Sequence, residues 1–345
     1  MKNLILFAFA LFLSFPNGSA QVFSVRMSDG SNLYFSVTDT TKKTVKIVRP
    51  QMFDNTKLIL PSGSLSIPAS VKFKNVLYGV TAIGDNAFSD AEQLRSVTIP
   101  SSVSFIGKEA FSECHNLTSI IFPALKPIMG KDVFEGCRSV SDISFGSEWK
   151  SIELERFASS DSLKTIVVPA KVNKMTGVKR VRNLQTIQVD PNNLAFSSHY
   201  GMLYSKDAKV FYACPIGYIG RVSVLDGTEK ILDGAFRDCG QMVSAIIPAS
   251  VHELSFDEFL TCKSLSRIWF YSEVPPVTAK WDGASVFALM VSNPDFQVYV
   301  PKNVFRKYRE SIWSSEGTYE TLEGKRKVTR DKGIFLTESN IKKIK

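Results

Sequence analysis

A fixed spacing of phenylalanines constrains this 345-residue chain more than any other feature. Six phenylalanines lie in two runs with 23-residue intervals: Phe88, Phe111, Phe134 and Phe157, then Phe236 and Phe259. The sequence around them recurs as well, in seven units: 80–102, 103–125, 126–148, 149–171, 172–192, 228–250 and 251–273. The fifth unit is two residues short and has Val178 where the others have Phe. A recurring period of this length is typical of repeat architectures.

Each unit contains two short strand patterns, one on either side of the turn that carries the phenylalanine. The first pattern ends at the position of Ile83. The second is the L-x-S-V-x-I-P stretch at 94–100, in which buried and exposed positions alternate. A 23-residue unit cannot bury its own apolar side, whereas stacked units share a continuous core. The sequence therefore predicts a β-rich solenoid in which the phenylalanines form one buried column.

The repeat also resembles a known family. Residues 106–123 contain the motif I-G-x-x-A-F-x-x-C-x-x-L-x-x-I, which ends here in I-F-P. This pattern is similar to the BspA-like leucine-rich repeat family of bacterial secreted and cell-surface proteins. The resemblance covers most of the chain after residue 20. It implies a leucine-rich repeat fold with a cap at each end and adhesion to host or bacterial proteins.

The predicted segments are a leader (1–20), an N-terminal β-meander cap (21–79), the solenoid (80–273), a small α+β C-terminal cap (274–317) and a basic tail (318–345). The meander strands are expected near 22–27, 33–38 and 44–48. The C-terminal cap is expected to hold a strand at 297–301 and an amphipathic helix at 303–313. Polar caps are needed because the open ends of a stack expose apolar faces and strand edges. Part of the tail is expected to be mobile.

One segment, 193–227, interrupts the repeat. Within it, the stretch GMLYSKDAKVFYACP predicts a β-hairpin that turns at Lys206 and Asp207.

The first twenty residues have the pattern of a signal peptide. Lys2 precedes an apolar run at 4–15, residues 16–18 break the run, and Ser19 and Ala20 are small. We predict cleavage after Ala20 and a protein that is secreted or at the cell surface. The alternative is a buried N-terminal helix. No apolar run reaches the ~18 residues that a membrane helix requires, so no transmembrane segment is predicted in the mature chain.

The net charge of +9 raises the question of nucleic acid. Export argues against it, and the basic residues are scattered apart from Lys325, Arg326, Lys327 and the C-terminal lysines. Attraction to acidic proteins or glycans, or simply a solvated surface, fits the charge better.

Motifs for catalysis are not apparent in the sequence, which lacks nucleotide-binding loops and C-x-x-C pairs. His252 and Glu253 begin a zinc motif that fails, because residue 256 is Phe. Cys214 and His199 would lie on opposite sides of the predicted hairpin with no third group to orient them. We therefore predict no enzyme activity, no cofactor and no metal.

Four of the five cysteines occupy one position of the repeat: Cys114, Cys137, Cys239 and Cys262. Export makes a ladder of disulfides or metal ligands conceivable. However, adjacent strands hold equivalent Cβ atoms about 4.8 Å apart, farther than the roughly 3.5–4.5 Å of a disulfide. Other units place Ala91, Ser160 and Val181 at this position. Buried free thiols are the favoured interpretation.

The outward position of the second strand is the candidate binding surface. In successive units it holds Thr98, Ile121, Ser144, Val167, Gln188, Ile246 and Trp269. We predict ligand-binding residues at Ile121, Val167, Gln188, Ile246 and Trp269, because exposed apolar and aromatic side chains mark interfaces. The alternative is that the hairpin or a cap covers part of this face.

These observations favour a non-enzymatic binding or adhesion protein whose partners are host or bacterial surface proteins. A carbohydrate-binding protein of the bacterial envelope, with Trp269, Trp281 and Tyr271 as stacking platforms, is one alternative. A purely structural envelope component is another.

Overall fold

The computed structural model describes residues 21–27, 30–49, 60–254, 259, 261–274, 296–304 and 306–307, and the backbone of 317–321, 324–328 and 341–344. The chain divides into two compact units, Met1–Arg182 (unit 1) and Asn183–Lys345 (unit 2). The described regular structure is almost entirely β-strand. Helical turns are short: η1 (Leu154–Phe157), η2 (Val178–Arg180) and η4 (Lys302–Val304).

Unit 1 begins with an antiparallel meander of three strands, β1 (Val22–Arg26), β2 (Asn32–Asp39) and β3 (Thr44–Val48). These strands agree with the predicted ones to within a residue or so. The third strand pairs in parallel with β6 (Val76–Ile83), which also pairs with the antiparallel β5 (Ser70–Phe73). The meander therefore covers an edge that the first repeat strand would otherwise leave unpaired.

Two parallel sheets form the repeat region of unit 1. One continues from β6 through β8 (Phe105–Ile106) to β10 (Ile128–Met129). The other contains β4 (Gly63–Ser66), β7 (Leu94–Thr98), β9 (Ser119–Ile121) and β11 (Asp142–Ser144). Further short strands are β12 (Ser151–Glu153), β13 (Thr165–Val168) and β14 (Lys174–Thr176).

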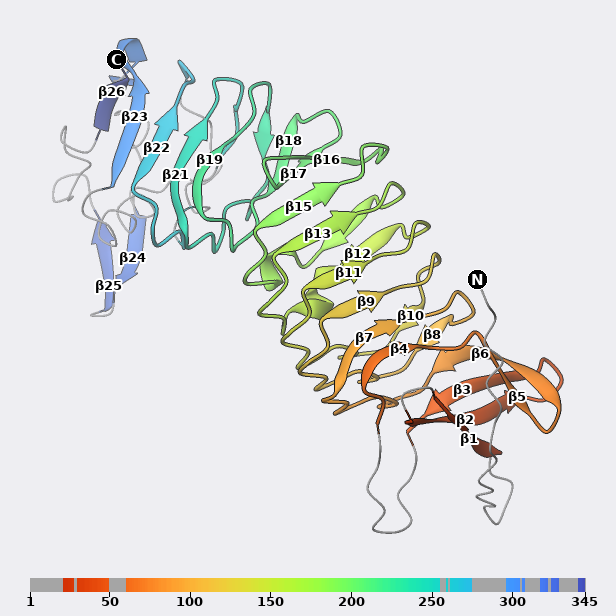
Figure 1. Ribbon diagram of the computed structural model, residues 1–345. Helices are drawn as coiled ribbons and strands as arrows, with labels where there is room; N and C mark the ends of the chain where they lie inside the picture. The colour runs from red at the N-terminus through yellow and green to blue at the C-terminus, as the bar shows by residue number, and fades with distance from the viewer. Residues whose placement is uncertain are drawn as a thin grey trace. The chain divides into compact units, whose positions relative to one another are not determined.

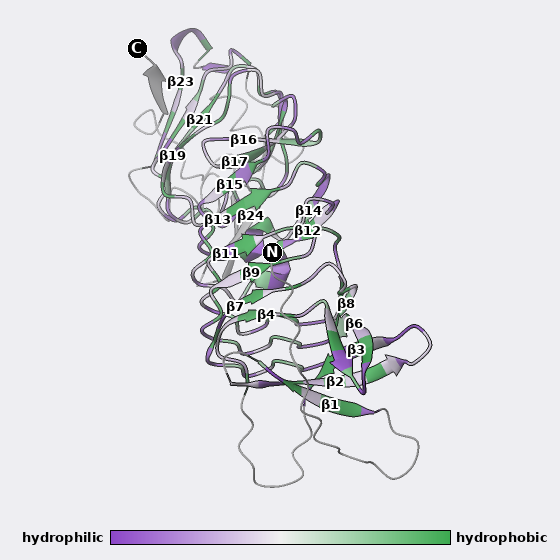
Figure 2. Cartoon of the chain, turned by 45° about the vertical axis from the view of Figure 1, so that its right-hand side comes forward, coloured by the Kyte–Doolittle hydropathy of each residue, from purple (hydrophilic) through white to green (hydrophobic). Residues whose placement is uncertain are grey.

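The strand register confirms the solenoid and its period. Ser96 pairs with Ser119, and Ser119 pairs with Asp142, so each turn of the chain advances by 23 residues. In Figure 1, β7, β9, β11 and β13 follow one another along unit 1. Hydropathy colouring places apolar residues mainly along the strands and polar residues along the connecting loops (Figure 2).

The phenylalanine column forms the core of unit 1, as predicted. All four rings are buried, with at most 3% of each residue exposed. Phe88, Phe111, Phe134 and Phe157 stack in that order, with ring centroids 5.0, 5.5 and 5.2 Å apart. Each turn therefore adds one aromatic layer to the next, which makes the core continuous.

Two larger sheets are described in unit 2. One consists of β16 (Phe196–His199), β17 (Met202–Ser205), β18 (Val210–Ala213) and β20 (Lys230–Ile231). The other consists of β19 (Gly220–Ser223), β21 (Met242–Ile247), β22 (Arg267–Phe270), β23 (Gln297–Pro301) and β26 (Ile341–Ile344), all paired in parallel. We call this second sheet the F sheet. Strand β15 (Thr186–Val189) precedes both.

The predicted hairpin is present as β17 and β18, and the segment around it contains more structure than the sequence indicated. An additional strand, β16, pairs with β17 across a turn at Tyr200 and Gly201, which both have positive φ. Strand β18 then pairs in parallel with β20, as a repeat strand would. Phe211 stacks on Phe236 with ring centroids 4.9 Å apart, so it extends the phenylalanine column of unit 2.

The C-terminal region contains the predicted strand as β23. At the predicted helix, the structure describes η4 and helical residues 306–307, and the rest of that prediction lies outside the described residues. In the basic tail, β24 (Gly317–Thr321) and β25 (Gly324–Val328) form an antiparallel hairpin, while β26 adds to the F sheet.

Candidate functional site

The five predicted site residues all point away from the core, but they are distributed over both units. Ile121 and Val167 belong to unit 1, where 44% and 51% of each residue is exposed. Gln188 is exposed in unit 2, and Ile246 and Trp269 are half-buried there. The structure places Ile246 directly beside Trp269, because β21 and β22 pair at these two residues.

A second ring stacks on Trp269. Tyr299 is its register partner on β23, and the two ring centroids lie 4.9 Å apart with an interplanar angle of 13°. On a face of the indole, the guanidinium carbon of Arg221 lies 5.3 Å from the ring centroid. Trp269 is therefore packed against both an aromatic ring and a cation.

Two rows of side chains cross the outward face of the F sheet. From β19 to β23, the first row holds Arg221, Ser244, Arg267 and Gln297. The second row holds Ser223, Ile246, Trp269 and Tyr299. We call the outward surface made by Arg221, Ile246, Arg267, Trp269 and Tyr299 the aromatic–basic face. Neither row contains an acidic residue.

Hydrogen bonds hold this surface in place. The hydroxyl of Tyr299 donates to Oε1 of Gln297 at 2.7 Å. The hydroxyl of Tyr218 donates to the carbonyl oxygen of Arg221 at 2.8 Å. Burial raises the pKa of the Tyr218 hydroxyl above its usual value.

The corresponding surface of unit 1 has a different chemistry. From β4 to β11, its first row is Ser64, Ser96, Ser119 and Asp142. Its second row is Ser66, Thr98, Ile121 and Ser144. Hydroxyl groups dominate, and Ser119 donates to the Asp142 carboxylate at 3.3 Å. Here Ile121 is an isolated apolar side chain, whereas Ile246 has an aromatic neighbour.

Sequence reasoning missed Arg221 and Tyr299. Tyr299 lies in a strand that was predicted, and the alternation of that strand places it outward. Arg221 lies in the interrupted segment, where no repeat strand was predicted, so its approach to Trp269 had no sequence signal.

The cysteine column is buried and reduced, which confirms the favoured interpretation. All five cysteines are free and buried. Cys114 donates to the carbonyl of Phe88 and Cys137 to that of Phe111, at 3.2 and 3.1 Å. Among the residues that the structure describes, no group of three or more His, Cys, Asp or Glu side chains could hold a metal ion.

The two residues considered for catalysis, Cys214 and His199, lie in different surroundings. Cys214 is buried, and its thiol donates to the carbonyl of Pro215 at 3.5 Å. His199 is exposed and packs edge-on against Tyr204. A buried thiol bonded to a carbonyl is not an activated nucleophile.

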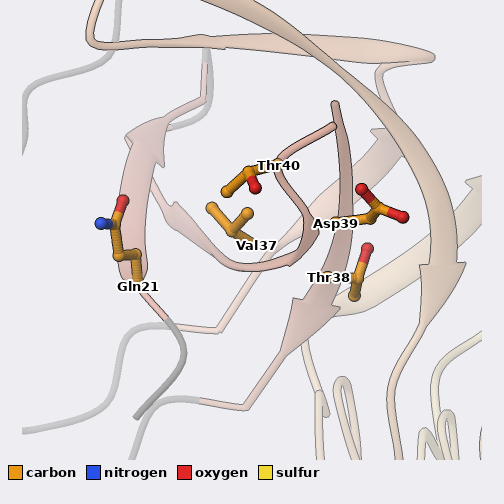
Figure 3. A pocket seen from close by; sticks show the side chains of 5 residues that line it. All are labelled: Gln21, Val37, Thr38, Asp39 and Thr40. Atoms are coloured by element: carbon orange, nitrogen blue, oxygen red, sulfur yellow. The ribbon is translucent and has the colours of Figure 1, made fainter. Parts of the chain in front are cut away.

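An open pocket of about 400 Å³ lies in the N-terminal meander (Figure 3). Gln21, Val37, Thr38, Asp39 and Thr40 line it. Its one carboxylate, on Asp39, already accepts a hydrogen bond from the Lys42 backbone amide at 2.8 Å. These side chains supply neither a nucleophile with a base nor a set of metal ligands.

The stacked repeats, the two parallel sheets and the phenylalanine column define a leucine-rich repeat solenoid. The profile of the BspA type leucine rich repeat region matches residues 65–178 and 203–280, in six copies. The chain belongs to this family. A comparison with curated proteins found no match.

Several solved structures are similar to this chain. A leucine-rich cell surface protein from Faecalibacterium prausnitzii is 18% identical, over 84% of this chain and 91% of its own, with a TM-score of 0.41. A leucine-rich repeat protein from Bacteroides ovatus is 18% identical, over 80% of this chain and 79% of its own, with a TM-score of 0.45. The pneumococcal vaccine antigen PcpA is 17% identical, over 84% of this chain and 96% of its own, with a TM-score of 0.39.

Proposed function

We propose that this chain is an exported, non-enzymatic protein that binds other proteins outside the cell through the aromatic–basic face of unit 2. One observation carries the proposal. The outward face of the F sheet gathers Ile246, Trp269 and Tyr299 beside two arginines, whereas the corresponding face of unit 1 is mainly hydroxyl-bearing. Aromatic residues and arginine are the side chains most enriched where proteins bind one another.

The proposed location rests on the N-terminal sequence and on family membership. The leader pattern at 1–20 predicts export, with Gln21 as the first residue of the mature chain. One structurally similar protein is described as a cell surface protein. In the part of the chain that the structure describes, no helix is long and apolar enough to span a membrane.

Protein recognition fits this surface better than sugar stacking. A sugar ring stacks on an open aromatic face, but Trp269 already contacts Tyr299 on one side and is packed by the Arg221 guanidinium. Of the other two residues considered for this role, Tyr271 is exposed and Trp281 lies outside the described residues. What Trp269 can still offer is its ring edge, next to the half-buried Ile246.

The remaining predicted site residues are proposed as secondary contacts. Gln188, Ile121 and Val167 are exposed, but among the described residues none of them has an aromatic partner like that of Trp269. A purely structural role would not need an aromatic–basic face and is therefore the weaker interpretation.

The test begins with N-terminal sequencing of the exported protein, which should begin at Gln21. That protein is then screened against purified extracellular-matrix and bacterial surface proteins, beside a glycan array. For a protein that binds, Trp269→Ala and Ile246→Ala should each raise Kd by about tenfold or more, as interface hot spots do. Ile128→Ala, at an exposed position of β10 in unit 1 that lies outside the proposed site, is the matched control and should leave Kd unchanged.

Two results would overturn the proposal. One is unchanged affinity in both unit 2 variants while their circular dichroism and thermal unfolding show them to be folded. The other is binding on the glycan array alone.

A further inference from the structure

The side chains of the aromatic–basic face indicate the chemical class of the partner that it would bind. We infer that this face binds an acidic protein segment, whose carboxylates pair with Arg221 and Arg267 while its apolar side chains lie on Ile246 and the edge of Trp269. This inference rests on the proposed function and adds the class of partner to it.

Arg221 is positioned to receive a carboxylate. The indole of Trp269 supports its guanidinium from one side, at 5.3 Å between guanidinium carbon and ring centroid. A guanidinium that stacks on an aromatic ring keeps its N–H groups in the guanidinium plane, where they can bind a carboxylate with two hydrogen bonds. Stacking also restricts the side chain before any partner arrives, which lowers the entropy cost of binding.

Arg267 supplies a second positive charge in the same row. The register places it two strands from Arg221, with Ser244 between them. At about 4.8 Å per strand, their Cα atoms are about 10 Å apart. Gln297 follows in this row, on β23. Its Oε1 accepts a hydrogen bond from Tyr299, and its amide N–H groups can donate to a partner. The row thus presents cationic and neutral donors to a partner.

The positive charge of this row is not neutralised by neighbouring acids. Neither Arg221 nor Arg267 forms an ion pair with any residue in the described parts of the chain. Glu229 and Glu253 lie beside β20, which belongs to the other sheet of unit 2. They form ion pairs with Lys209 and Lys230, respectively. Glu273 follows the end of β22 and accepts a hydrogen bond from Asn303 at 3.2 Å.

The apolar half of the face favours an acidic protein over a sulfated glycan. Ile246 and the indole edge gain by contact with apolar side chains, which sulfated sugars lack. A partner that offers carboxylates and apolar groups together would use both rows at once.

The test uses defined polymers with fluorescence anisotropy as the readout. The main probe is a copolymer of glutamate and tyrosine; the comparison probes are polyglutamate and a heparin oligosaccharide. The copolymer should bind most tightly, and its affinity should fall between about 0.05 and 0.5 M NaCl, because exposed charge pairs are screened by salt. Equal or tighter binding of polyglutamate or heparin would overturn the inference.

Variants then locate the site. Arg221→Gln and Arg267→Gln should each raise the Kd for the copolymer by about tenfold. Arg221→Lys, which keeps the charge but loses the two-pronged donor, should weaken binding by several-fold. Arg95→Gln, an equal charge change at an exposed position of unit 1, is the matched control and should have no effect. An Arg95→Gln effect as large as that of Arg221→Gln would show general charge attraction and overturn the inference.

The outcome is separable from that of the proposed function. If Trp269→Ala abolishes protein capture while both arginine-to-glutamine variants bind like the wild type, the proposed function stands and the acidic partner is wrong. Thermal unfolding of every variant checks that a loss of binding does not reflect a loss of fold.

Discussion

At the scale of single residues, the thiols show how a repeat stack can keep its cysteines unreactive. Cys137 donates to the carbonyl of Phe111, one turn earlier, at 3.1 Å. A hydrogen bond with Cys114 and burial both raise the pKa of the Cys137 thiol. Because the thiolate is the reactive form, these thiols should be inert in the folded protein.

We expect a maleimide reagent to label none of the five cysteines in the native protein and all five in denaturant, counted by mass spectrometry. A Cys114–Cys137 disulfide in the native protein would contradict this.

Ser160 shows what a different residue does at the same position of the repeat. Its hydroxyl donates to the carbonyl of Val140 at 2.6 Å and accepts from the Leu163 amide at 3.1 Å. Like the cysteines, it is buried and bonds to the backbone. Ala91 and Val181 are buried at the same position in other repeats, so the position requires a small or medium-sized side chain and does not require sulfur.

At the scale of elements, a partly buried ion-pair group joins neighbouring turns of unit 1. Glu153, at the end of β12, accepts from Lys126 at 2.5 Å and from Arg156 at 2.7 Å. Burial alone would raise the pKa of Glu153, but the hydrogen bonds from these two cations outweigh it and hold the pKa below its usual value. A lowered pKa in the folded state stabilises the fold above the unfolded pKa of about 4.3, and this contribution is lost as pH falls through the folded pKa.

We expect Glu153→Gln to lower the free energy of unfolding at pH 7 by about 1 kcal/mol or less, since the group is partly exposed. In acid, the variant and the wild type should converge, because the wild-type carboxylate becomes protonated there. Urea unfolding at a series of pH values measures both. Glu148→Gln is the control, because its pair with Lys171 is more exposed and should matter less. A constant difference between wild type and Glu153→Gln at every pH would rule out the assigned charge interaction.

The strands also show which parts of the fold could be predicted from the sequence. The 23-residue period predicted the register of β7, β9 and β11, because these successive turns repeat the same contacts. It did not predict the role of Phe211, which lies 25 residues before Phe236 and follows two antiparallel strands. Strand alternation likewise placed Trp269 outward. The guanidinium on its ring comes from Arg221, 48 residues earlier, and such a contact depends on strand order rather than on local pattern.

At the scale of the whole molecule, each unit has its own phenylalanine column. In unit 1 the column ends at Phe157, and the following repeat has the smaller Val178. In unit 2, Phe211, Phe236 and Phe259 stack at 4.9 and 5.1 Å. In a solenoid, stability is approximately the sum of each repeat and its contacts with adjacent repeats. Damage to one column should therefore be felt most strongly within its own unit.

Phe111→Ala tests this directly. Phe111 is fully buried between Phe88 and Phe134, so its truncation should cost about 3–5 kcal/mol of unfolding free energy. The control is Phe105→Ala on β8, where 41% of the residue is exposed and the cost should be about 1 kcal/mol or less. Hydrogen exchange with mass spectrometry should show faster exchange in β7, β9 and β11 of the Phe111 variant, with β21 and β22 unchanged. Equal acceleration in both units would mean that the chain unfolds as one cooperative body, and a Phe111 cost no larger than that of Phe105 would mean that the column does not hold the core.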